Sequence, residues 1–103
     1  MSQLAHNVYF SLKEPTDANR KALIAACKTY LTDHPGTVFF GVGTVEPELA
    51  RPVNQRDFDV SLHLVFASRA DHDTYQDAPR HHQFVNENKE NWATVRVFDS
   101  LID

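Results

Sequence analysis

Alternating hydrophobic and polar positions near the start of the chain predict a β-strand over residues 4–13, with one strongly apolar side. The hydrophobic period then changes to 3.6 residues, which predicts a helix that opens at Pro15 and Thr16. The sequence His-Pro-Gly at residues 34–36 ends this helix. A second strand is therefore expected over residues 37–45.

The second half of the chain repeats the same order of elements. Residues 58–67 show the clearest strand alternation, and Ser68 and Asp71 have the spacing of a capping box that opens a short helix. Pro79 starts another helical stretch, and a last strand is expected over residues 92–101. The order β-α-β-β-α-β predicts an α+β, ferredoxin-like fold, in which helices cover one face of an antiparallel four-stranded sheet.

Strand parity divides the predicted sheet into two faces. The helix-facing side takes the apolar sets of the first and third strands and, from the last strand, Val95, Val97 and Asp99. The opposite face still carries large apolar side chains, each of which gains about 1.5 to 3 kcal/mol on burial. We therefore expect a second copy of the chain to cover it, giving a homodimeric α/β barrel. The side chains expected inside that barrel are Tyr9, Val65, Trp92 and Phe98, with Asn7, Ser61, His63 and Arg96 as polar members.

Residues 46–57 contain two prolines and lack sustained periodicity, so a long loop is expected there. Loops of this length in a small domain are usually solvent-exposed connections, or else they close a pocket or contact a partner. The sequence leaves these alternatives open.

Composition limits the classes of function. The 103 residues make a single domain, residues 1–103, and 10 basic against 14 acidic residues give a net charge of −4. The basic residues are scattered, which argues against nucleic acid or a membrane surface as a partner. The single cysteine, Cys27, excludes an internal disulfide, and the start of the chain lacks a signal-peptide pattern. A cytoplasmic protein is expected.

The helix that follows Pro79 carries the chemically most informative residue. His81, Phe84 and Val85 share one apolar face of this helix, whereas His82 points elsewhere. A histidine held on such a face can transfer protons. It can equally be a core residue whose nitrogens are satisfied by a carboxylate and a carbonyl, and the spacing does not separate these two roles.

Metal and cofactor sites are not expected. The six histidines show neither an i, i+4 pair nor a cysteine partner at metal-site spacing. The sequence Gly-Val-Gly at residues 41–43 lacks the third glycine and the strand-to-helix context of a dinucleotide loop.

Five short motifs follow one another in a distinctive order along nearly the whole chain. They are His6-Asn7-Val8, Gly41-Val42-Gly43, Phe58-Asp59-Val60, the stretch that spaces Tyr75, Pro79, His81 and Phe84, and Val97-Phe98-Asp99. In this order and spacing the chain resembles the stress-responsive A/B barrel domain family, also called Dabb, of the dimeric α/β barrel superfamily.

The resemblance implies a site in a pocket between sheet and helices. Most members have no assigned reaction, so binding of a small organic ligand with an uncharacterised activity is expected first. One branch consists of cofactor-independent polyketide cyclases, in which the histidine matching His81 is the base and the tyrosine matching Tyr75 lies beside it. Residues matching His6 and Asp99 line the same pocket in that branch. The resemblance thus implies His81 as base and Tyr75 as proton donor.

The chain departs from the family pattern at two positions. Ala78 replaces a histidine that usually precedes the proline, and Val60 replaces a pocket histidine of the cyclases. Val60 and Phe84 are therefore expected as apolar pocket residues. A cyclase-like or isomerase-like enzyme stays an alternative to ligand binding. A non-catalytic assembly or stress protein, or a monooxygenase-like member of the superfamily, is a third alternative.

Overall fold

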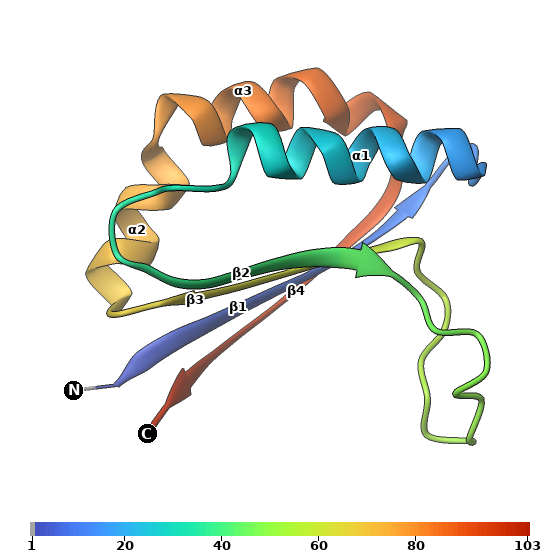
Figure 1. Ribbon diagram of the computed structural model, residues 1–103, viewed down its shortest axis with the longest axis horizontal. Helices are drawn as coiled ribbons and strands as arrows, with labels where there is room; N and C mark the ends of the chain where they lie inside the picture. The colour runs from blue at the N-terminus through green and yellow to red at the C-terminus, as the bar shows by residue number, and fades with distance from the viewer. Residues whose placement is uncertain (1) are drawn as a thin grey trace.

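The sheet and helices follow the predicted order, as the computed structural model of residues 2–103 shows (Figure 1). In the second half of the chain the helical region is divided into two by the predicted break before Pro79. The elements are β1 (Gln3–Leu12), α1 (Asp17–Tyr30), β2 (Thr37–Thr44), β3 (Val60–Phe66), α2 (Arg69–Asp77), α3 (Pro79–Asn88), the single-turn 3-10 helix η1 (Lys89–Asn91) and β4 (Trp92–Ile102).

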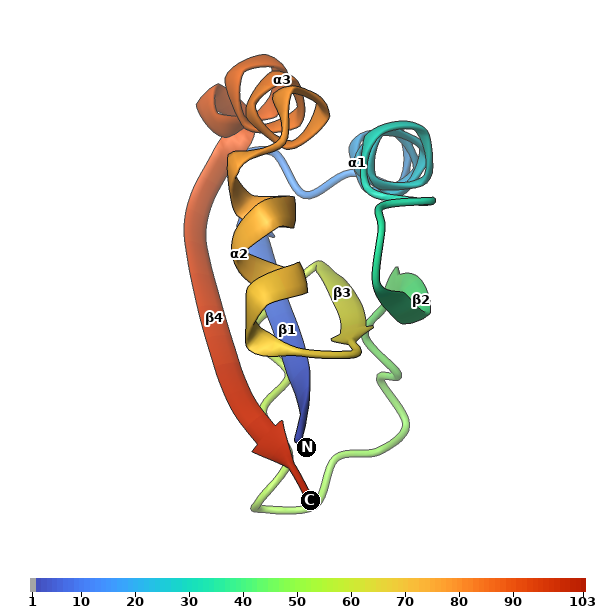
Figure 2. The same cartoon turned by 90° about the vertical axis from the view of Figure 1, so that its left-hand side faces the viewer.

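The four strands form one antiparallel sheet in the order β2-β3-β1-β4. All three α-helices lie on the same side of this sheet, and α1 and α3 run side by side (Figures 1 and 2). The central strand β1 pairs with both β3 and β4, which places His6 directly between Leu64 and Asp99. The predicted ferredoxin-like architecture is confirmed.

The helices begin at the residues that the sequence indicates. Thr16 is the N-cap of α1, and its hydroxyl accepts a hydrogen bond from the Asn19 amide at 3.1 Å. Ser68 caps α2 in the same way, accepting from the Asp71 amide at 3.2 Å. Ala78 has extended backbone, as expected before a proline, and this residue separates α2 from α3. None of the helices within residues 2–103 is long and apolar enough to cross a membrane.

The hydrophobic core lies between the sheet and the helices. Each α-helix contributes one or two buried side chains, and Leu31 follows α1 directly. The inward positions of β1 and β3 contribute the rest. The free thiol of Cys27 is part of this core. The core residues are Leu4, Val8, Phe10, Leu12, Leu23, Cys27, Leu31, Val60, Leu62, Leu64, Phe66, Tyr75 and Phe84.

The last strand is less buried than its pattern predicts. Val95 and Val97 pair with inward-facing residues of β1, so they are on the helix-facing side, yet they are 40% and 51% exposed. The reason is that β4 is an edge strand and its main neighbour is β1. Strand parity predicts the side on which a residue lies but not how well the helices cover it.

Trp92 lies on the side of the sheet opposite to the one predicted. Its ring packs against Phe10 at 4.9 Å and against Phe84 at 5.7 Å between ring centroids, both on the helix-facing side. The cause is a register shift between Ser11 and Leu12, after which Leu12 pairs with Trp92. An extra residue in one strand reverses the alternation beyond it, so simple parity fails at this position.

Candidate functional site

Side chains from four elements meet at the end of the sheet that α2 covers. His6 comes from β1, Tyr75 from α2, His81 from α3 and Asp99 from β4. The His6 and Tyr75 rings lie with centroids 6.0 Å apart, and both residues are almost fully buried. The four residues predicted to form a site are therefore brought into one region, which we call the histidine cluster.

Within the histidine cluster, Asp99 pairs with His6 and not with His81. The Asp99 Oδ1 atom lies 2.5 Å from His6 Nδ1 because the two residues are directly opposite in the β1–β4 register. Burial lowers the pKa of His6, while the hydrogen bond to Asp99 acts in the opposite direction. The β1–β4 register therefore forms a His6–Asp99 pair.

His81 instead contacts Tyr75. Their ring centroids are 4.8 Å apart with an interplanar angle of 66°, an edge-to-face arrangement. His81 Nδ1 is buried and has no hydrogen-bond partner among the described residues. Burial lowers the pKa of His81 to about 4, so the ring is neutral at neutral pH. The same burial raises the pKa of Tyr75 and keeps its hydroxyl protonated.

Two further histidines, which the sequence analysis did not single out, complete the histidine cluster. The His34 ring contacts Tyr75 with centroids 5.0 Å apart, and its Nε2 lies 2.7 Å from the Tyr30 carbonyl oxygen. The His72 ring lies 5.1 Å from the His6 ring. His72 precedes Tyr75 by three residues, and this helical spacing is a signal that could have found it.

Val60 and Phe84, the expected apolar pocket residues, lie in the core. Val60 pairs with Phe10 across β1 and β3, four residues along the strand from the level of His6. Phe84 packs against Phe10 with ring centroids 6.3 Å apart, and against Trp92. These two residues therefore line the interior beyond the histidine cluster.

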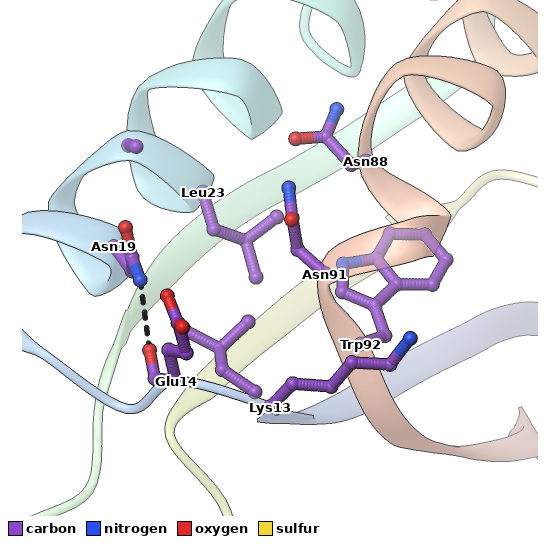
Figure 3. Close-up of a pocket in the computed structure, with 9 residues that line it drawn as sticks. Lys13, Glu14, Asn19, Leu23, Asn88, Asn91 and Trp92 are labelled. Carbon is purple, nitrogen blue, oxygen red and sulfur yellow. Dashed lines mark hydrogen bonds between the residues drawn. The ribbon is translucent and has the colours of Figure 1, made fainter.

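A cavity of about 290 Å³ opens between α1 and the end of α3, lined in part by the sheet (Figure 3). Trp92 Nε1 is buried and has no hydrogen-bond partner in the described part of the chain, and in Figure 3 it lies on the side of the ring that faces Asn91 and Leu23. Asn19, by contrast, donates to the Glu14 carbonyl oxygen at 2.9 Å. The lining residues are Leu12, Lys13, Glu14, Asn19, Ala22, Leu23, Asn88, Asn91 and Trp92.

The outer face of the sheet has a hollow of its own. Tyr9 contacts Phe58 and Phe98 there, and Arg96 donates to Asp57 Oδ1 at 2.8 Å. Phe98 is 56% exposed. The polar residues predicted for this face are also present, with His63 bonded to Asn7 and Ser61. A cavity of about 430 Å³ is lined by Asn7, Tyr9, Val53, Asn54, Gln55, Phe58, Arg96 and Phe98.

Comparison with protein families gives one match over nearly the full length. The family model described as the stress responsive A/B barrel domain matches residues 4–102. No curated protein sequence matches the chain.

Solved structures with the same fold include a Dabb family protein from Mesorhizobium loti, which is 20% identical, with a TM-score of 0.80 and coverage of 97% of this chain and 96% of that one. A dimeric ferredoxin-like protein of unknown function from Thermobifida fusca is 17% identical, with a TM-score of 0.80 and coverage of 98% and 92%. The hydroxynitrile lyase of Passiflora edulis is 18% identical, with a TM-score of 0.79 and coverage of 98% and 94%. At these identities the comparison shows a shared fold.

Proposed function

Because the chain belongs to the stress-responsive A/B barrel domain family, we propose that it binds a small organic molecule with a carbonyl group in the cavity between α1 and α3. The observation that carries the proposal is that Trp92 lines this cavity while its buried Nε1 atom has no hydrogen-bond partner within residues 2–103. A buried donor without a partner is costly, and a ligand acceptor would remove that cost.

The size and lining of the cavity favour one small ligand. Its volume of about 290 Å³ is at the lower end of the range for small-molecule sites. Leu12, Leu23 and the Trp92 ring supply apolar walls, while Asn88 and Asn91 supply amides that can bind a second polar group. A planar aromatic aldehyde or ketone matches this mixture.

Trp92 is the only tryptophan of the chain, so its fluorescence reports directly on the cavity. We expect a panel of small aromatic aldehydes and ketones to contain compounds that change this emission saturably. Calorimetry with Trp92→Phe, which keeps an aromatic ring but removes the N–H, is expected to show weaker binding by about tenfold, the effect of one lost hydrogen bond of about 1 to 1.5 kcal/mol.

The control is Thr29→Ala, because Thr29 is on helix α1, which borders the cavity, but is not among the lining residues. This variant is expected to bind as the unchanged protein does. Equal affinity of the Trp92→Phe variant and the unchanged protein would refute the assignment of the indole as the ligand's donor.

A second candidate function is cofactor-free proton transfer next to a carbonyl, with His81 as base and Tyr75 as proton donor. The specific observation in its favour is that His81 is neutral, contacts Tyr75 and has a buried Nδ1 atom with no hydrogen-bond partner among the described residues. A neutral imidazole can accept a proton from carbon, and a protonated tyrosine can donate to the developing enolate oxygen.

Deuterium exchange tests this candidate without knowledge of the natural substrate. Enolisable ketones in deuterated buffer are followed by NMR, and exchange at the carbon next to the carbonyl is expected to depend on the protein. His81→Ala should lower that rate by about 10² or more. His82→Ala is the matched control, since His82 is exposed on the same helix. Unchanged exchange in the His81→Ala variant would exclude His81 as the base.

We also propose that the chain forms a homodimer through the outer face of the sheet. The similar protein from Thermobifida fusca is dimeric. On the outer face of the sheet of this chain, the side chains of Phe39 and Phe98 are 55% and 56% exposed. Polar residues between them, such as His63 and Asn7, are already paired within the chain, so covering them leaves few unsatisfied groups.

A further inference from the structure

We propose that His6, His72 and Asp99 form a binding site for a divalent transition metal ion, with Zn²⁺ as the best-matched ion. The ligand atoms of these three residues lie within 4.8 Å of one another, although they come from β1, α2 and β4. The sequence predicts no metal site, because its six histidines show neither an i, i+4 pair nor a cysteine partner at metal-site spacing. This inference does not depend on the proposed function.

His72 is oriented as a metal-binding histidine is. Its Nδ1 lies 3.0 Å from Asp73 Oδ1, and Asp73 in turn accepts from Arg69 at 2.9 Å. A histidine that donates from Nδ1 to a carboxylate keeps a lone pair on Nε2, which is the arrangement found around metal-bound histidines. Asp73 therefore fixes the tautomer that a metal requires.

The second observation concerns the other nitrogen of the same ring. His72 Nε2 is buried and has no hydrogen-bond partner among residues 2–103, and the His72 side chain is only 13% exposed. A buried acceptor without a partner is rare in folded proteins. A metal ion between His72 and the His6–Asp99 pair would satisfy it.

His6 and Asp99 complete the donor set. The His6 ring lies 5.1 Å from the His72 ring, and the ion would take the place of the proton that His6 Nδ1 and Asp99 Oδ1 share, which is released to solvent. The Asp99 side chain is 42% exposed, which gives the carboxylate freedom to rotate and leaves the ion a path from solvent. Small rotations of Asp99 and His72 bring the three donor atoms to the spacing of about 3 to 3.5 Å that bonds of about 2.0 to 2.2 Å produce.

The chemistry of the donor set selects the ion. Two imidazoles and one carboxylate suit zinc and its neighbours among the first-row metals, whereas Ca²⁺ and Mg²⁺ prefer oxygen ligands. Three protein ligands leave a position for water or a ligand. Arg69 carries a positive charge near the site, which would repel a cation. Its ion pair with the Asp73 carboxylate offsets that charge.

Metal titration of protein without an affinity tag tests the proposal. The protein is treated with a chelator, dialysed, and titrated with ZnCl₂ in a calorimeter and with CoCl₂ in a spectrophotometer. We expect one ion per chain, with visible Co²⁺ absorption bands of a nitrogen- and oxygen-ligated site. His72→Ala and Asp99→Asn should each weaken Zn²⁺ binding by at least about 100-fold, and Asp73→Asn by about tenfold.

His82→Ala is the matched control, because it removes an exposed histidine outside the site. It should bind Zn²⁺ as the unchanged protein does. Circular dichroism verifies that each variant is folded, and Asp73→Asn tests the site even if His72→Ala unfolds. Failure of the unchanged protein to bind Zn²⁺ at micromolar concentration would overturn the proposal. The proposal would also be overturned if Asp99→Asn and Asp73→Asn, both folded, bound Zn²⁺ with the affinity of the unchanged protein.

Discussion

At the residue scale, His81 and His6 show that a nearby carboxylate affects how strongly a buried histidine is held in its neutral form. Both lose solvation, which lowers the pKa of each. His6 has a hydrogen-bond partner in Asp99, whereas His81 Nδ1 has none within residues 2–103 and the His81 ring packs against Tyr75. His81 is therefore the residue of the histidine cluster that is most clearly held neutral.

This state of His81 predicts how stability depends on pH. The pKa of His81 is about 4 in the folded chain against 6.5 for an ordinary histidine, so the unfolded chain binds more protons between these values. The His81 contribution to stability is complete above pH 6.5 and is lost as the pH falls toward 4. Urea unfolding of chelator-treated protein measures the free energy of unfolding at each pH, and this energy should depend less on pH in the His81→Gln variant. His82→Gln should change the slope much less, because His82 adds only a charge effect to the burial that lowers the pKa of His81. The slope of the unchanged protein in His81→Gln would contradict the prediction.

Cys27 allows a second prediction at this scale. The thiol is fully buried, and burial raises its pKa to about 12. Because only the thiolate reacts rapidly, the folded protein should not react with Ellman's reagent over the time in which a small thiol reacts completely. In urea the thiol should react stoichiometrically. Rapid reaction without urea would show that the core around α1 opens readily.

At the scale of elements, the connection between α1 and β2 depends on one glycine. Gly36 has a φ of 81°, a conformation that residues with a Cβ rarely adopt. A Cβ added there would lie 2.2 Å from Asp71 Cγ, at the start of α2. The turn thus joins three elements at one crowded point.

Gly36→Ala should lower the free energy of unfolding by about 2 kcal/mol or more, since it adds backbone strain and displaces Asp71. Gly43→Ala is the matched control because a Cβ there meets no atom within 4 Å in the chain. Urea unfolding compares the two variants. A smaller loss in Gly36→Ala than in Gly43→Ala would contradict the role of this turn.

At the scale of the whole molecule, the two faces of the sheet differ in what covers them. The helices cover one face (Figures 1 and 2). The core, the histidine cluster and the cavity at Trp92 lie on that side of the sheet. Within residues 2–103 no helix covers the other face, where Tyr9 and Phe98 form an aromatic contact. An apolar face of this kind is typical of a surface that pairs with another chain.

Substitutions at two neighbouring residues of β4 test whether the outer face is the dimer interface. Phe98 is on the outer face and Val97 on the helix-facing side, and they are 56% and 51% exposed. We expect sedimentation to show a dimer for the unchanged protein, a monomer for Phe98→Asp and a dimer for Val97→Asp, because only the first places a charge within the proposed interface. A monomeric unchanged protein at micromolar concentration would refute the dimer.

The sequence by itself determined the element order, the helix starts and most of the two-sided pattern of the sheet. These features depend on local physics: the periods of 2 and 3.6 residues, the caps at Thr16 and Ser68, and the break at Pro79. Local rules failed at Trp92, because the register shift that reverses its side arises from pairing between β1 and β4.

Only the tertiary structure decided which polar residues meet. The motifs predicted that His6, Tyr75, His81 and Asp99 lie in one region. The strand register, however, pairs Asp99 with His6, while His81 contacts Tyr75. The proximity of His72 to His6 joins residues 66 positions apart, a distance that no motif spacing encodes. Contacts of this kind depend on how α2 crosses the sheet, and that is fixed by packing of the whole core and not by any local pattern.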